Sequence, residues 1–159
     1  LKTFGEDHPD VAAIRNNLAG AWRDKGQYDK AIGYYELALA SSLKTFGEHH
    51  PNVAAIRNNL AGAWGAKGQH DKAIGYYELA IASGLKTFGE DHPDVAVSRN
   101  NLAGAWGAKG QYDKAIEYYE LALASSLKTF GEDHPDVATF RNNLASAWKS
   151  KEQSDISGD

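Results

Sequence analysis

Apolar residues recur at helical spacing in two successive segments near the start of the chain. The first segment runs from Pro9 to about Lys25, and its apolar residues lie three or four positions apart, at Val11, Ile14, Leu18 and Trp22. The second opens at about Tyr28 and keeps this spacing up to Gly47, through Ala31, Ile32, Tyr35, Ala38, Leu39, Leu43 and Phe46. Such spacing places apolar residues on one face of an α-helix. Because no stretch sustains an alternation of period two, the pattern predicts helices and no strands.

Short polar segments, GEDHP and KGQYD, separate these helices. Asp7 is the residue that we expect to cap the first helix, since its side chain can accept hydrogen bonds from backbone N–H groups of the first turn. Pro9 suits the first turn, and Gly26 tolerates the left-handed backbone conformation that commonly ends a helix. The segment is therefore predicted to form a first helix, a tight turn and a second helix.

This helix pair recurs along the chain. The sequence LKTFGE begins at Leu1, Leu43, Leu85 and Leu127, so the chain repeats every 42 residues. The second copy differs from the first at seven positions and the third at five. Units this similar should adopt one structure and stack by one operation, which is the arrangement of a solenoid. The repeat predicts seven helices, with first helices opening near Pro9, Pro51, Pro93 and Pro135 and second helices near Tyr28, His70 and Tyr112.

The repeat also sets the expected domain organisation. A single array covers residues 1–151, in units 1–42, 43–84, 85–126 and a partial unit 127–151. Residues 152–159 form a polar tail that we expect to fray, because Glu152 replaces the turn glycine and the opening of a second helix is missing. The chain starts on residues that elsewhere end a second helix, so we expect it to be part of a longer array.

Several repeated positions resemble those of the tetratricopeptide (TPR) repeat family. The family pattern is Leu and a small residue, then an aromatic residue, then Ala, an aromatic residue and Ala. The first unit meets it at Leu18, Ala19, Trp22, Ala31, Tyr35 and Ala38, and the second and third units match at the equivalent positions. Units of this length that contain HPDVA, NNLA and YDKAI are similar to the kinesin light chain and nephrocystin type. In one departure, the family's early aromatic residue is replaced by Arg15, Arg57, Arg99 and Arg141.

The resemblance implies an all-α fold, a right-handed α-solenoid of stacked antiparallel helix pairs whose first helices line a concave face. It also implies a protein-protein interaction scaffold that binds a peptide or protein element in that groove. Neighbouring units have to stack because a two-helix unit cannot bury both of its apolar faces alone. We expect Trp22 and Tyr35 to fill the space between the helices, with Ala19, Ala31 and Ala38 at their close approach.

Paired asparagines recur on the face of the first helices that the resemblance places in the groove. The first candidates for peptide contact are the second asparagines of each pair, Asn17, Asn59, Asn101 and Asn143. The other candidates are the first asparagines, Asn16, Asn58 and Asn100. An amide offers two donors and an acceptor, so a ladder of them can bind the backbone of an extended peptide. The second asparagines resemble the ladder in the TPR superhelix of O-GlcNAc transferase. Alternatively, one asparagine of each pair bonds between adjacent helices and only stabilises the stack.

Arginines and glycines on the first helices leave a similar choice open. The arginines, Arg15, Arg57, Arg99 and Arg141, either contact carboxylates of an acidic peptide or pair with a glutamate such as Glu36 or Glu78 on a neighbouring helix. Glycines inside these helices each cost about 1 kcal/mol relative to alanine. They either open the groove to a ligand or let neighbouring helices approach, and they lie at Gly20, Gly62, Gly65, Gly104 and Gly107.

Composition narrows the functional classes. The chain has no cysteine and carries 17 Lys and Arg against 21 Asp and Glu, so we expect no nucleic-acid partner. No apolar run approaches the roughly 20 residues of a membrane helix, so we expect no membrane partner. One histidine per unit fits a loop or cap position, at His8, His50, His92 and His134. We find neither a metal signature nor a nucleophile motif, and we expect no metal, no cofactor and no enzymatic activity.

The sequence thus predicts a cytoplasmic, non-enzymatic scaffold whose partner is a protein or an extended peptide. Two alternatives stay open. One is a structural array that self-associates, end to end or as a dimer, through uncapped terminal repeats. The other is a regulatory repeat segment of a larger multidomain protein.

Overall fold

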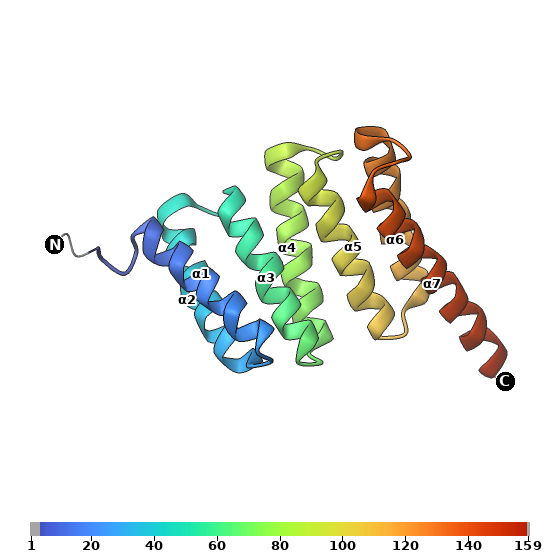
Figure 1. Ribbon diagram of the computed structural model, residues 1–159, viewed down its shortest axis with the longest axis horizontal. Helices are drawn as coiled ribbons and strands as arrows, with labels where there is room; N and C mark the ends of the chain where they lie inside the picture. Colours follow the sequence, from blue (N-terminus) through green and yellow to red (C-terminus); the bar gives the residue numbers. More distant parts are fainter. Residues whose placement is uncertain (1–3, 159) are drawn as a thin grey trace. The chain divides into compact units, whose positions relative to one another are not determined.

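The computed structural model describes residues 4–158, which form seven α-helices and no strand (Figure 1). The helices are α1 (Pro9–Asp24), α2 (Tyr28–Phe46), α3 (Pro51–Ala66), α4 (His70–Phe88), α5 (Pro93–Ala108), α6 (Tyr112–Phe130) and α7 (Pro135–Ser157). Odd-numbered helices are the first helices of the repeats and even-numbered helices are the second. The predicted helix number, order and starting residues are confirmed.

Histidines cap the first helices, and the expectation that Asp7 would do so is wrong. The Nδ1 atom of His8 accepts a hydrogen bond from the backbone N–H of Asp10 at 3.1 Å, and His50 does the same for Asn52 at 3.2 Å. The histidine directly precedes the proline in extended conformation, which is where a cap residue belongs. Asp7 lies one residue too early and instead forms an ion pair with Lys44 on α2.

Each histidine cap also packs against a phenylalanine four residues earlier, which for His50, His92 and His134 lies at the end of the preceding second helix. The ring centroids of Phe46 and His50 lie 4.2 Å apart in a stacked arrangement. The glycine between helix and cap has a positive φ of 85° at Gly47, and Gly26 in the other turn has a φ of 75°. These conformations are the ones that glycine adopts without steric cost, so the predicted turn chemistry at Gly26 is confirmed.

The end of the chain is helical where fraying was expected. Helix α7 continues through residues 152–157 to Ser157. Lys151 explains part of this, because its ammonium lies 3.3 Å from the Asp155 carboxylate one turn later and 3.2 Å from Asp113 at the start of α6. Missing turn glycines therefore let the helix run on instead of ending it.

The helices pack in two compact units, the first ending at Thr87 and the second beginning at Phe88. In the first unit α1 packs on α2 and α2 on α3. Ala19, Ala31 and Ala38 are fully buried there, and Tyr35 is 1% exposed. These residues confirm the expected close approach of the two helices. Trp22 is only half-buried and covers the edge of this core.

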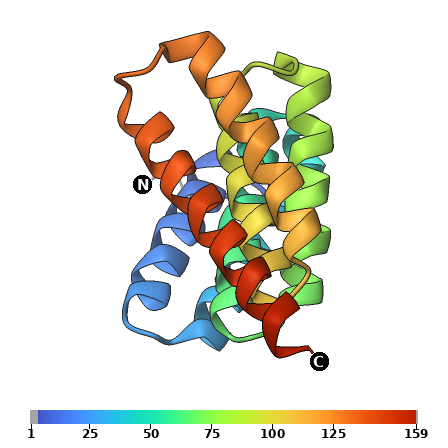
Figure 2. The same ribbon diagram turned by 90° about the vertical axis from the view of Figure 1, so that its right-hand side faces the viewer.

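The second unit repeats the same neighbour packing. Helix α5 packs on α6 and α6 on α7, and Figure 2 shows α6 and α7 side by side. Ala96, Ala122 and Phe140 form a buried cluster with Leu123 packed against it. In both units, consecutive helices bury their apolar faces against each other, as the repeat predicts.

Leu60 and Leu18 occupy the same position in successive repeats and provide a matched test of this core. Leu60 is fully buried, whereas Leu18 is 39% exposed. We expect Leu60→Ala to lower the free energy of unfolding by about 2–5 kcal/mol, because it leaves a cavity. Leu18→Ala should cost clearly less. Urea denaturation followed by circular dichroism measures both, and equal losses would contradict the packing described.

Candidate functional site

In the first unit, a groove lies between the first helices α1 and α3. It encloses about 160 Å³. Ala13, Asn16 and Asn17 of α1 line one side, and Asn52 and Ala55 of α3 line the other. Short side chains at these positions leave the helix surfaces open between the amides. The groove therefore combines polar groups with room for an approaching backbone.

The amides of adjacent repeats are joined by hydrogen bonds. The Nδ2 atom of Asn59 on α3 donates to Oδ1 of Asn16 on α1 at 3.2 Å. In the second unit, Nδ2 of Asn143 on α7 donates to Oδ1 of Asn100 on α5 at 2.9 Å. The second asparagine of one repeat thus bonds to the first asparagine of the preceding repeat. This is the stack-stabilising arrangement that the sequence left open as an alternative.

This bonding still leaves amide groups unused. Each donating amide keeps its second N–H group and its carbonyl oxygen. Asn17 is exposed and makes no side-chain hydrogen bond to any described residue. Asn58 and Asn101 lie half-buried on α3 and α5. The structure therefore brings Asn16, Asn17 and Asn59 together in the first unit as a local amide cluster.

A second groove lies between α5 and α7 in the second unit. It encloses about 270 Å³. Its lining comes from α5, α6 and α7 and includes Gly104, Gly107, Asn143, Ser146 and Ser150. Asn143 was expected here, but Ser146 and Ser150 were not. At both serine positions the fourth repeat differs from the other three. That difference is the feature of the sequence that could have pointed to them.

The glycines of the first helices lie beneath tyrosine hydroxyls. A Cβ atom on Gly20, Gly62 or Gly104 would lie 3.7, 3.6 or 3.5 Å from the hydroxyl of Tyr35, Tyr77 or Tyr119, respectively. Burial raises the pKa of all three tyrosines above its ordinary value, because a buried phenolate would lose its hydration. These glycines therefore face a side chain of their own repeat, at distances where a Cβ atom would make ordinary van der Waals contact.

The arginines are paired, but the expected pairing with Glu36 or Glu78 is wrong. Arg57 is 4% exposed. Its Nη2 atom lies 2.7 Å from the carboxylate of Glu48, and its Nη1 atom donates to the Ser83 hydroxyl at 3.1 Å. Long side chains on a helix point back toward its N-terminus, and the guanidinium therefore reaches the loop before its own helix.

The same nine-residue pairing recurs in the other repeats. Arg99 lies 2.5 Å from Glu90, and Arg141 contacts Glu132. Arg15 is more loosely placed, 4.0 Å from Glu6. A ligand carboxylate would therefore have to compete with a glutamate that is already in contact with each arginine.

This arrangement of helices matches that of a known family. The tetratricopeptide repeat model matches residues 10–83, 65–125 and 107–155. The chain belongs to the tetratricopeptide repeat family. The predicted all-α solenoid fold class is confirmed, and solved TPR structures share the stacked helix pairs. No curated protein sequence matches the chain.

Two similar solved structures come from proteins of the kinesin light chain type. BtubC (BKLC) from P. vanneervenii is 30% identical with a TM-score of 0.83, over 94% of this chain and 61% of that one. A putative kinesin light chain from Podosopora anserina with nearly identical TPR-like repeats is 31% identical with a TM-score of 0.83, over 94% and 71%. This TPR chain thus spans about three fifths of the length of BtubC.

A more distant structure shares the fold alone. It is the first TPR of Spaghetti (RPAP3) bound to the HSP90 peptide SRMEEVD, 17% identical with a TM-score of 0.66 over 90% of this chain and 94% of that one. Among residues 4–158 of this TPR protein, no helix has the length and apolar character needed to cross a membrane. The described His, Asp and Glu residues form no group of three or more suited to a metal ion.

The buried arginine contact gives a test of what these arginines do in the TPR fold. We expect Arg57→Ala to lower the free energy of unfolding by about 2–3 kcal/mol, because Ser83 and Glu48 lose their donor. Arg15→Ala should cost less than about 1 kcal/mol, because its partner is exposed and distant. Chemical denaturation of both variants measures the difference. A similar small loss in both would mean that Arg57 is free for another role.

Proposed function

We propose that this TPR protein is a non-catalytic scaffold that binds an extended peptide segment of a partner protein between its first helices. The observation that carries the proposal is the amide cluster of the first unit, where exposed Asn17 lies in a groove beside Asn16 and Asn59 is bonded to Asn16. Such a cluster offers hydrogen bonds without imposing a charge.

Recognition of this kind depends on backbone geometry more than on ligand side chains. An extended peptide presents N–H and C=O groups at regular intervals, and an amide can donate to one and accept from the other. Ala13 and Ala55 on the groove walls leave space for a peptide backbone to come within hydrogen-bond distance. The Asn59–Asn16 bond fixes part of the cluster before a ligand arrives, which reduces the entropy lost on binding.

The RPAP3 structure supports the proposal by analogy, since a peptide is bound to a TPR in that protein. It says nothing about which sequence this chain prefers. Our proposal includes a cytoplasmic location, as the cysteine-free chain does not depend on an oxidising compartment for disulfides.

Asn17 gives the sharpest test, because its side chain bonds to no described residue and its loss should leave the fold intact. A peptide selected from a random 12-residue display library serves as the probe, with affinity measured by calorimetry. We expect Asn17→Ala to weaken binding by at least about tenfold, equivalent to about 1.4 kcal/mol. The melting temperature should not change.

Gln69→Ala is the control for this experiment. Gln69 is an exposed amide in the turn after α3 and lies outside the lining of the groove. Its loss should leave the affinity as it is. If Asn17→Ala binds the selected peptide as tightly as the parent protein does, the peptide does not use the amide cluster and the proposal fails.

Self-association is a second candidate function, and the surface of α1 favours it. Ile14 is 65% exposed and Leu18 is 39% exposed, whereas the equivalent Ile56 and Leu60 on α3 are buried. We expect an average mass that rises with concentration in light scattering across a dilution series, and that Ile14→Glu suppresses. A monomer at every concentration would contradict this candidate.

A further inference from the structure

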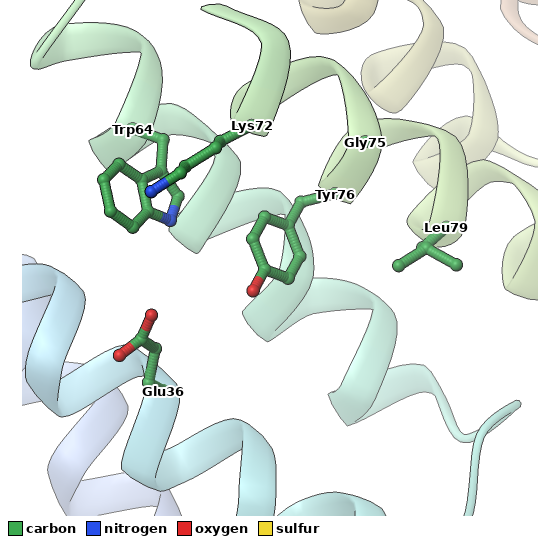
Figure 3. Close-up of a pocket in the computed structure, with 6 residues that line it drawn as sticks. All are labelled: Glu36, Trp64, Lys72, Gly75, Tyr76 and Leu79. Atoms are coloured by element: carbon green, nitrogen blue, oxygen red, sulfur yellow. The ribbon is translucent and has the colours of Figure 1, made fainter. Parts of the chain in front are cut away.

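The first unit has another groove on the side of its second helices, between α2 and α4 (Figure 3). It encloses about 410 Å³, within the range of small ligand sites, and most of its lining is apolar. The lining residues are Glu36 from α2, Trp64 from α3, and Lys72, Gly75, Tyr76 and Leu79 from α4. None of them belongs to the amide cluster or the arginine pairs.

The helix period explains why these residues meet. On α4 the lining residues follow each other at intervals of three, one and three positions, which places them on one face of the helix. Gly75 keeps the middle of that face open, since a Cβ atom there would have no neighbour within 4 Å. The equivalent position is Gly33 in the first repeat and Glu117 in the third, so the third repeat lacks this open position.

Glu36 supplies a carboxylate opposite two aromatic rings. Figure 3 shows the carboxylate pointing from α2 toward Trp64, and the hydroxyl of Tyr76 pointing into the same space. Glu36 is exposed and forms no ion pair or hydrogen bond with any described residue. No bonded partner therefore neutralises the Glu36 carboxylate in this groove.

A cation of the chain itself already rests on the tryptophan. The ammonium of Lys72 lies 4.0 Å from the centroid of the Trp64 ring (Figure 3). Lys67 lies 5.6 Å from the same ring, but Asp29 neutralises it at 2.6 Å. Lys72 is exposed and has no carboxylate partner, so rotation of its side chain can free the ring face. The ring is thus a site at which a cation is stable.

We propose that this groove binds an arginine side chain of a partner protein. The guanidinium would stack on the aromatic rings and form a bidentate contact with the Glu36 carboxylate, while its methylene groups pack on Leu79. Arginine fits better than lysine because its planar group is more weakly hydrated and pairs with a carboxylate through two hydrogen bonds. The ligand guanidinium displaces the Lys72 ammonium from the face of the Trp64 ring.

The charges in the groove favour this ligand over an acidic one. A ligand carboxylate attracted by Lys72 would have to enter a space that the Glu36 carboxylate faces, at the cost of like-charge repulsion. A guanidinium entering the same space meets the uncompensated acid and displaces one flexible ammonium. The two ligand classes therefore predict opposite effects of removing Lys72.

The probe is N-acetyl-argininamide, titrated into the isotope-labelled protein while NMR follows the Trp64 indole N–H signal, assigned with Trp64→Phe. We expect a saturable shift in the millimolar range, and a much smaller one with N-acetyl-leucinamide or with the acidic N-acetyl-glutamic acid amide. Absence of a saturable shift up to about 50 mM argininamide overturns the proposal, as does a preference for the acidic probe.

Charge variants then identify the contacts. We expect Glu36→Gln to weaken argininamide binding by about tenfold and Lys72→Ala to strengthen it a few-fold. Glu120→Gln is the matched control, because Glu120 lies in the same YYELA sequence on α6 and does not line this groove. Weaker binding in Lys72→Ala, or an unchanged affinity in Glu36→Gln, overturns the assignment.

A steric pair tests the location without changing charge. Gly75→Gln places a side chain in the open middle of the groove and should abolish the shift. The control is Ala124→Gln, which places the same neutral side chain at an exposed position of α6 outside the lining of this groove and should leave binding intact. Circular dichroism confirms that each variant is folded. Retained binding in Gly75→Gln overturns the location.

Discussion

The close contact between the first and second helix of each repeat is the constraint on which the rest of the molecule depends. Fully buried alanines let the helix backbones approach, and Tyr35 fills the remaining space. Its hydroxyl lies over Gly20 of the first helix, at a distance where a Cβ atom would come into van der Waals contact with it. Because these residues recur every 42 positions, the same contact recurs, and the grooves of each unit lie at positions fixed by it.

The loops that join one repeat to the next are held in place by a second set of recurring contacts, most of them polar. A histidine caps each first helix and packs against a phenylalanine four residues earlier. The loop glutamate pairs with the arginine nine residues later, as Glu48 does with Arg57. Together these contacts explain why GE, HP and R recur at the same spacing in every repeat of this chain. They also occupy the arginines, which leaves uncharged amides as the available polar groups of the α1–α3 groove.

The two faces of the first unit therefore differ in chemistry. The first helices present amides and small residues, which suit an extended backbone. The groove between α2 and α4 combines the rings of Trp64 and Tyr76 with a lysine and an unpaired carboxylate around an open glycine, which suits a single cationic side chain. Both faces arise from the same repeat, because a helix that is buried along one stripe leaves its other stripe free to vary.

The sequence by itself determined the seven helices, their starting residues and the buried positions such as Ala31 and Tyr35, because periodicity and turn chemistry act locally. It also named Asn16, Asn17 and Asn143 as groove residues. Only the tertiary structure decided that Asn59 bonds to Asn16, that Arg57 turns back to Glu48, and that His8 caps α1 in place of Asp7. The groove around Trp64 and Tyr76 was also visible only there. These choices depend on distances between residues that are far apart in the chain, or on which of two neighbouring side chains can reach an atom. A pattern of residue types does not contain that information.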